Sequence, residues 1–309
     1  MAAIEGLSNI DGLSQAELAG LQIHKAAFNP VAFIGKVLTY AALIAYSLFS
    51  LLPIYWTATL AFKAESEIYT KTPKLWGFAT TMDNWKEVFA GPASITGVDF
   101  IQAITNSLIV TIPAVLLALA LGTPVAYVLA RYDFKGKGDV HFFYLSLYFM
   151  PPLLILIPLF VLYNKIHLYN TFLGMWLVLQ LICLPLVVLI MLGFFKDIPI
   201  EIEQSARVDG ASGIWVFWRI ILPLVRPGLL ATAFLCTIFS WNNYLYSYLL
   251  TSGEHQTAVV RLTLYRTFTG IVWGPMSGAI LLTVVPVLIL AIAIQKYLVR
   301  GLTLGAVKG

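Results

Sequence analysis

Six long apolar runs constrain this chain more than any other feature of its sequence. They cover approximately Val37 to Phe62, Ile104 to Ala130, Phe142 to Tyr163, Thr171 to Phe195, Pro227 to Leu250 and Met276 to Gln295. Each run reaches the roughly 20 residues with which an α-helix crosses the hydrocarbon of a bilayer, where backbone polar groups have to be satisfied inside the segment. The runs therefore predict an all-α fold, a polytopic bundle of six transmembrane helices.

The composition excludes an ordinary soluble domain. Of the 309 residues 60% are hydrophobic and 11% are charged, with a mean hydropathy of +0.86, whereas soluble domains have roughly a quarter charged residues. The net charge of +4 comes from scattered lysines and arginines and not from one basic face, so we expect no nucleic-acid partner. The first 36 residues are mixed polar, and the first apolar run is too long for a cleavable signal peptide, so we expect it to be an anchor.

The distribution of basic residues predicts the orientation. Twelve lysines and arginines fall in the segments before 37, at 131–141, at 196–226 and after 295, and seven fall in the remaining connecting segments. Cytoplasmic loops carry the excess of basic residues, so both termini are predicted to be cytoplasmic. The expected organisation is an N-terminal segment (1–36), a transmembrane domain (37–295) that includes cytoplasmic helices at 197–223, and a cytoplasmic tail (296–309).

The six runs contain no Asp, Glu, Lys, Arg or His. Proton-coupled transporters place ionisable groups at membrane depth, so proton-driven transport is disfavoured. The alternative of an ion-coupled secondary transporter stays open, because hydroxyl and backbone oxygens can bind sodium. The sequence also lacks a carboxylate pair within a run and any GxxxxGK[ST] phosphate loop. We therefore expect no enzymatic activity here, and any ATP to be bound by another chain.

Cysteine and histidine suggest no metal site. Cys183 and Cys236 both fall inside apolar runs, where free cysteine is usually a small core residue. The four histidines are dispersed among the connecting segments without ligand spacing.

The segment from Pro199 to Pro223 is a polar helix–turn–helix in an otherwise apolar chain. Asp197 is expected to cap a first helix that ends at Gly210, whose missing Cβ tolerates the left-handed conformation that closes many helices. Ser212 is expected to cap a second helix, Ile214 to about Leu222, which Pro223 then breaks. The small face of Ser205, Ala206, Gly210 and Ala211 suits close docking of a soluble partner. The alternative is a hairpin lying on lipid headgroups.

This segment resembles the coupling loop of permease subunits in bacterial ABC importers. The shared pattern is ARVDGA, in which Asp209 precedes Gly210, followed after nine further residues by Ile220, Ile221, Leu222 and Pro223. The family commonly has glutamate where this chain has Gln204, and that glutamate pairs with a basic residue of the ATPase. Either Gln204 makes a neutral hydrogen bond there or Glu203 substitutes. Neighbours on a helix point about 100° apart, which favours Gln204.

The resemblance covers most of the chain and is greatest to the carbohydrate type 1 branch, specifically to the second permease of maltose-like systems. AYVLARYDFKGK, SWNNYLYSYLLTS and the terminal QKYLVRGLTLGAVKG carry it. In relatives the tail reaches toward the ATPase dimer, which would place Gly301, Thr303, Gly305 and Lys308 near that partner.

The resemblance implies a function and partners. The chain would be a permease subunit of an importer for a sugar, oligosaccharide or polyol in the bacterial cytoplasmic (inner) membrane. Its partners would be a second, MalF-like permease, a MalK-like ATPase dimer that binds ATP and Mg²⁺, and an extracytoplasmic solute-binding protein. The outer segments from Lys63 to about Ala103 and from Thr251 to Pro275 are the expected extracytoplasmic contact regions.

One polar and aromatic cluster lies inside an apolar run. It consists of Trp241, Asn242, Asn243 and Tyr244. Asn amides can bond sugar hydroxyls, and aromatic rings can stack on the apolar face of a sugar, so these residues are candidates for the translocation pathway. The alternative is that the amides join helices within the bundle.

Overall fold

The computed structural model describes residues 30–268 and 270–306, and the side chains of residues 33–268 and 270–295. The chain divides into two units, residues 1–55 and residues 56–309, with the boundary inside helix α2 (Pro30–Phe62). The described side chains of the first unit, residues 33–55, are exposed throughout. An exposed apolar helix is what a lipid-facing segment presents.

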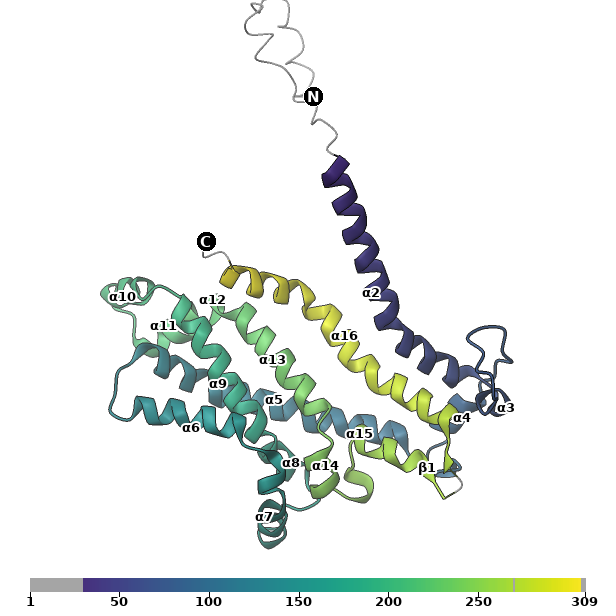
Figure 1. Cartoon of the computed structure of the whole chain (residues 1–309). Helices are drawn as coiled ribbons and strands as arrows, with labels where there is room; N and C mark the ends of the chain where they lie inside the picture. Colours follow the sequence, from purple (N-terminus) through teal and green to yellow (C-terminus); the bar gives the residue numbers. More distant parts are fainter. Residues whose placement is uncertain (1–29, 269, 307–309) are drawn as a thin grey trace, which may run out of the picture. The chain divides into compact units, whose positions relative to one another are not determined.

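The second unit is almost entirely helical (Figure 1). Its longest helices are α5 (Phe100–Arg131), α9 (Gln180–Asp197), α13 (Arg226–Trp241) and α16 (Trp273–Ala306). Shorter helices are α3 (Glu65–Ile68), α4 (Asp83–Phe89), η3 (Gly91–Ala93), α6 (Lys137–Phe149), α7 (Pro152–Lys165), α8 (Phe172–Val178), α14 (Leu245–Leu250), η5 (Gly253–His255), α15 (Ala258–Arg261) and η6 (Leu262–Tyr265). Strands β1 (Arg266–Thr267) and β2 (Gly270–Ile271) pair antiparallel, with Arg266 opposite Ile271.

Four described helices are long and apolar enough to cross a membrane: residues 33–62 of α2, α5, α9, and residues 273–295 of α16. Two bent helix pairs raise the number to as many as six if each pair counts as one span. The predicted fold class, an all-α membrane protein, is therefore confirmed, with four to six candidate spans.

Three of the six apolar runs are interrupted and are not continuous helices. The run Phe142 to Tyr163 is α6 and α7, which meet at an angle of 94°. Pro151 and Pro152 cause this break, because a proline disfavours helical geometry at the residue before it and has no amide hydrogen to donate. The run Thr171 to Phe195 is α8 followed by α9, and the run Pro227 to Leu250 is α13 followed by α14.

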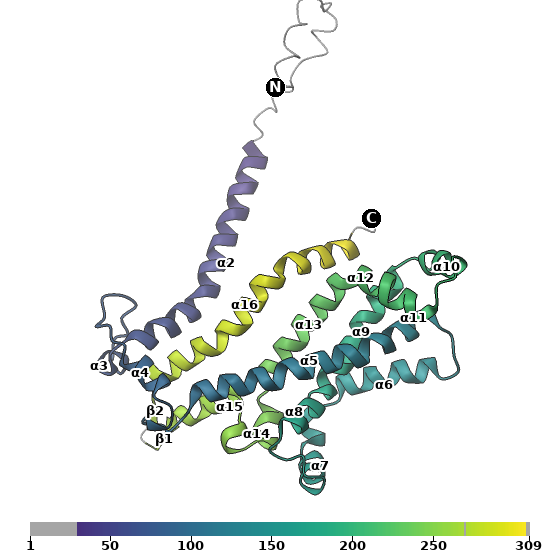
Figure 2. The same cartoon turned by 180° about the vertical axis from the view of Figure 1, so that it is seen from behind.

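The packing centre of the second unit is formed by α5, α9 and α13, which lie side by side in Figures 1 and 2. Val187 and Cys183 of α9 and Cys236 of α13 are fully buried there. Gly122 lets α5 approach α9 closely, because a Cβ at this position would lie 2.7 Å from Cγ1 of Val187. Both cysteines are free and buried, which confirms their prediction as small core residues.

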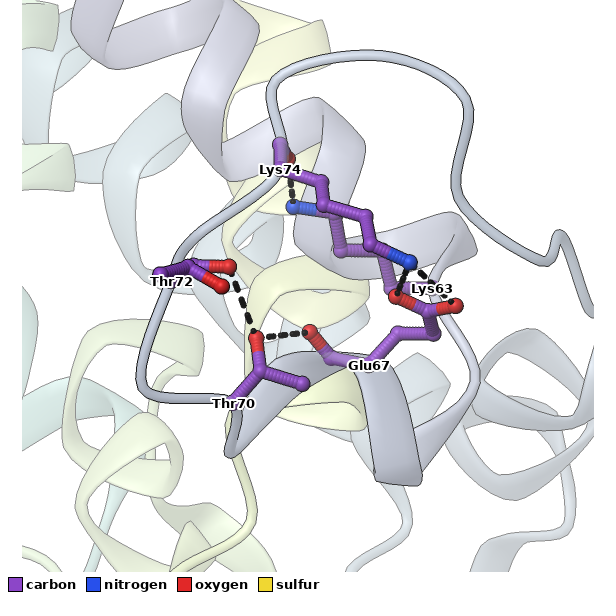
Figure 3. A network of polar contacts seen from close by, with 5 residues as sticks. All are labelled: Lys63, Glu67, Thr70, Thr72 and Lys74. Carbon is purple, nitrogen blue, oxygen red and sulfur yellow. Dashed lines mark hydrogen bonds and ion pairs between the residues drawn. The ribbon is translucent and has the colours of Figure 1, made fainter.

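The segment that follows α2 is fixed by a buried lysine (Figure 3). Lys63 is 1% exposed, its Nζ donates to the carbonyl oxygen of Lys74 at 2.6 Å, and it lies 4.3 and 4.8 Å from the ring centres of Trp56 and Phe78. Burial lowers the pKa of Lys63, and the Glu67 carboxylate acts in the opposite direction. The segment from Lys63 to Lys74 is thus closed onto the end of α2.

The segment between α14 and α16 is attached to α5. The side-chain amide of Asn106 donates to the carbonyl oxygens of Glu254 and Gln256, and Ser107 Oγ accepts from the amide of Ala258 at 2.9 Å. Phe268, which follows β1, is fully exposed. Two buried polar side chains of α5 therefore position this segment.

Candidate functional site

The polar helix–turn–helix forms one compact projection between α9 and α13 (Figures 1 and 2). It comprises α10 (Glu201–Val208), α11 (Gly213–Val216), a π-helical turn η4 (Phe217–Ile221) and α12 (Leu222–Leu224). We call this set the helix pair. It lies at the end of the unit where α5 and α9 terminate, so these two packed helices set its position.

The predicted cap at the start of the helix pair was wrong. Asp197 is the last residue of α9, and α10 begins after Ile200 without a side-chain cap hydrogen bond. Ile198 is extended, with φ −81° and ψ 126°, as expected for the residue before Pro199. The chain therefore leaves α9 after Asp197, and Ile200 instead of Asp197 occupies the N-cap position of α10.

The turn at Gly210 has the geometry that the sequence predicts. Gly210 has φ +88°, which only glycine adopts readily. Its amide donates to the carbonyl oxygen of Arg207 at 3.0 Å, and the amide of Ala211 donates to that of Ala206 at 3.0 Å. These two bonds form a Schellman motif, which satisfies the last carbonyls of α10.

The second helix starts as predicted and ends differently. Ser212 Oγ accepts from the amide of Trp215 at 3.3 Å, which confirms the cap. However, the chain stays helical through Pro223 as far as Leu224, and the bend of 74° falls at Val225. The π-helical turn widens the helix just before Pro223, with the amide of Leu222 bonded to the carbonyl of Phe217. Pro223 then occupies the first turn of α12, where no helical donor is required.

Most of the coupling residues expected from the sequence lie on an accessible surface. Gln204, Ser205, Asp209, Gly210 and Pro223 are exposed, and Ala206, Ala211, Ile220 and Leu222 are half-buried. An open hollow of about 590 Å³ lies between the two helices and is lined by Ala206, Asp209, Gly210, Ala211, Ser212, Trp215 and Ile220. The small side chains around Gly210 thus leave room for another molecule to approach the backbone.

Glu203 departs from this pattern because it faces inward. Its side chain is 3% exposed and forms an ion pair with Nε of Arg131, the last residue of α5. Its other carboxylate oxygen accepts from the hydroxyl of Tyr127 at 2.7 Å. The Glu203 carboxylate is thus engaged within the chain, whereas the neighbouring Gln204 is exposed. Arg131 and Tyr127 were not among the site residues predicted from the sequence. Both lie in AYVLARYDFKGK, one of the segments that carry the family resemblance.

The polar and aromatic cluster of the fifth run is split by the break between α13 and α14. Trp241 is 3% exposed, and its indole donates to the carbonyl oxygen of Thr283 in α16 at 3.1 Å. Asn243 Oδ1 accepts from the amide of Tyr246 at 3.1 Å and so caps α14. These two side chains hold helices in place.

The other two members of the cluster are exposed. The side-chain amide of Asn242 donates to the carbonyl oxygen of Ile238 at 2.9 Å, one turn earlier in α13. The Tyr244 ring stacks on that of Tyr248, with 5.3 Å between the ring centres and 19° between the ring planes. A solute passing this surface would therefore meet Asn242 and the tyrosine pair.

The tail predicted from residue 296 onward begins without a break in the helix. α16 continues to Ala306 and contains the backbone of Gly301, Thr303 and Gly305. Lys308 lies outside the described residues.

Comparison with known families and proteins agrees with the resemblance to ABC importer permeases that the motifs indicate. The family model described as binding-protein-dependent transport system inner membrane component matches residues 122–304. The trehalose transport system permease protein SugB of Mycobacterium tuberculosis is 32% identical over 265 residues, which are 84% of this chain and 93% of that protein. The trehalose/maltose transport system permease protein MalG of Thermococcus litoralis is 30% identical over 276 residues, 89% of this chain and 97% of that protein.

Solved structures show the same fold. A chain of a bacterial ABC transporter involved in the import of the acidic polysaccharide alginate superposes with a TM-score of 0.73 at 20% identity, covering 88% of this chain and 99% of that chain. A chain of the MetNI methionine ABC transporter in an inward-facing conformation superposes with a TM-score of 0.55 at 16% identity, covering 64% and 93%.

Proposed function

Because the chain belongs to the binding-protein-dependent transport system inner membrane components, we propose that its helix pair couples it to a separate ATPase. The chain is a multi-pass permease of the carbohydrate, MalG-like type, a translocation subunit of an ATP-driven importer and not an enzyme. Coupling to ATP therefore requires a surface that a soluble partner can reach and that is firmly connected to the transmembrane helices.

The observation that carries this proposal is the exposed turn at Gly210. The turn is closed by its own hydrogen bonds, and the adjoining hollow of about 590 Å³ is lined beside the turn by the small residues Ala206, Gly210, Ala211 and Ser212. We assign Gln204 to the contact with the ATPase, since its side chain points outward while Glu203 is buried. The ATPase dimer would be MalK-like and would bind ATP and Mg²⁺, with Gly301, Thr303, Gly305 and Lys308 of the tail near it.

The remaining partners follow from the same proposal. A MalF-like permease would supply the other half of the pathway, and an extracytoplasmic solute-binding protein would deliver the solute. The helix pair and both termini then lie on the cytoplasmic side of the inner membrane. The solute would be a sugar, oligosaccharide or polyol, which the trehalose and maltose permeases among the relatives support, and Asn242 and Tyr244 would line its route.

The test is the substitution Gly210→Trp, studied in the assembled transporter. Because nothing lies within 4 Å of a Cβ at Gly210, the chain itself has space for the indole, and insertion into the membrane should be normal. Uptake and co-purification of the ATPase should be lost. Gly97→Trp is a matched control for co-purification of the ATPase, since Gly97 also has a positive φ and open surroundings but lies in a segment expected to be extracytoplasmic.

Two results would contradict the proposal. The first is unchanged uptake by the Gly210→Trp transporter. The second is accumulation of solute by this chain alone in liposomes with an ion gradient, which would support a secondary transporter instead.

A further inference from the structure

We propose that Arg131 and Glu203 form the joint through which movement of the helix pair reaches the transmembrane helices. In this role both are positioning residues for transport: they connect the ATPase contact to α5 and α9 without touching solute or nucleotide. The inference rests on the proposed function of the helix pair. It adds residues that connect this surface to the membrane helices.

The joint is a buried ion pair in which both carboxylate oxygens of Glu203 accept hydrogen bonds. The side chains of Arg131 and Glu203 are 7% and 3% exposed. One carboxylate oxygen of Glu203 accepts from Nε of Arg131, and the other accepts from the hydroxyl of Tyr127 at 2.7 Å. Nη2 of Arg131 donates to the carbonyl oxygen of Ile198 at 2.9 Å. A single guanidinium therefore holds the end of α5, the residue after α9, and α10.

Burial makes this link stiff. Separating two buried, hydrogen-bonded charges leaves each without a partner in a poorly solvated site, which is strongly unfavourable. α10 therefore cannot shift against α5 without breaking the pair. A displacement of α10 is transmitted to α5. The Lys137–Asp133 pair nearby, at 2.8 Å, is different, because the Asp133 side chain is 99% exposed and exposed pairs contribute little.

The ring of Tyr127 extends the joint into the packed helices. Its centre lies 5.5 Å from that of Phe195 in α9 and 4.8 Å from that of Phe217 in η4. Tyr127 therefore contacts Glu203 through its hydroxyl. Its ring packs against α9, which precedes the helix pair, and against η4, which is part of it. An exposed hydrogen bond of 3.0 Å from Arg207 to the hydroxyl of Tyr132 is a second, weaker connection.

The two faces of α10 make different contacts. Glu203 points into the joint, and Gln204, about 100° further around the helix, points outward. A force applied at the outward face is thus transferred one residue away to a buried ion pair.

The experiment compares Glu203→Gln, Arg131→Lys and Tyr127→Phe in the complete transporter, reconstituted in liposomes with its ATPase and solute-binding protein. Glu203→Gln keeps the shape but removes the charge. We expect the ATPase to co-purify normally and ATP hydrolysis to continue, while uptake per ATP hydrolysed falls roughly tenfold, within the range of coupling changes that single substitutions produce. Tyr127→Phe, which removes one hydrogen bond, should lower this ratio by only about twofold.

Asp133→Asn, in the exposed pair, is the control and should leave the ratio unchanged. The exchanged pair, Glu203→Arg with Arg131→Glu, should recover part of the lost ratio. A purely structural role would lower yield and thermal stability but leave uptake per ATP at the wild-type value in the assembled fraction, and this result would overturn the proposal. Tyr127→Phe, the mildest variant, keeps that comparison available if the charge variants fail to assemble. Absence of the ATPase from the wild-type complex would instead refute the proposed function.

Discussion

The indole nitrogen of Trp176 donates a hydrogen bond of 2.9 Å to the backbone carbonyl oxygen of Ile109. In a regular helix this carbonyl would accept from the amide four residues later, which in α5 is Pro113 and has no hydrogen to donate. Trp176 supplies the missing donor from α8. A proline inside a long apolar helix has thus become an attachment point for its neighbour.

This relationship predicts a non-additive effect. Trp176→Phe should lower the stability of the protein in detergent by about 1 kcal/mol, the usual contribution of a hydrogen bond. In a Pro113→Ala background the alanine amide can satisfy Ile109, so the same substitution should cost clearly less. Thermal unfolding of the two single variants and the double variant measures the difference. An equal cost in both backgrounds would show that the indole does not replace the proline's missing donor.

A second prediction concerns the approach of α13 to α9. A Cβ at Gly228 would lie 2.5 Å from Cγ of the Phe194 ring, so Gly228→Ala should destabilise the protein by about 1–3 kcal/mol through overpacking. Adding Phe194→Leu should recover part of the loss. The control is Gly193→Ala in α9, where a Cβ meets nothing within 4 Å and alanine should stabilise the helix by up to about 1 kcal/mol. Thermal unfolding tests all three, and equal effects at Gly193 and Gly228 would contradict the packing argument.

The backbone of the helix pair gives a third prediction. Gly210 has φ +88° and open surroundings, so substitutions there are penalised by conformation and not by collision. Gly210→Asn should retain more thermal stability in detergent than Gly210→Ala, and Gly210→Val should retain least, because asparagine tolerates the left-handed region and β-branched residues do not. The left-handed conformation costs alanine roughly 1–2 kcal/mol. Thermal unfolding measures this order, and a stability that follows side-chain size instead would contradict the argument.

A fourth prediction separates pathway residues from structural ones. The exposed ring of Tyr244, stacked on Tyr248, is available to a sugar face, whereas the buried Trp241 bonds to Thr283. Tyr244→Ala should therefore raise the KM for uptake by roughly fivefold to tenfold, within the usual contribution of an aromatic contact, and leave thermal stability nearly unchanged. Trp241→Phe should lower stability by about 1 kcal/mol with little effect on KM. Uptake kinetics and unfolding of the two variants provide the comparison.

Much of this molecule could be predicted from local sequence signals. Runs of apolar residues identified the helical membrane class, and the glycine and serine of the helix pair identified its turn and second cap. These features depend on a few neighbouring residues, because the left-handed turn at Gly210 and the cap at Ser212 are stabilised by bonds within the segment. The Asp197 cap failed because α9 extends to include that residue.

Features that depend on tertiary packing could not be predicted in the same way. Apolar composition does not distinguish one long helix from two helices joined at 94°, although the adjacent Pro151 and Pro152 were a usable signal. The inward orientation of Glu203 depends on Arg131, which is 72 positions away in the sequence. A charged residue at the end of an apolar helix and an acidic residue at the start of a polar one become partners only when α5 and α10 are brought together.

The Schellman motif at Gly210 has a consequence for association kinetics. Its two backbone bonds fix the angle between α10 and α11 before any other protein is present. A partner that binds this surface therefore does not have to immobilise a flexible segment, which would cost about 1–2 kcal/mol for each ordered residue. Docking then proceeds as the meeting of two rigid shapes, and repeated cycles of attachment and release lose no free energy to refolding the contact.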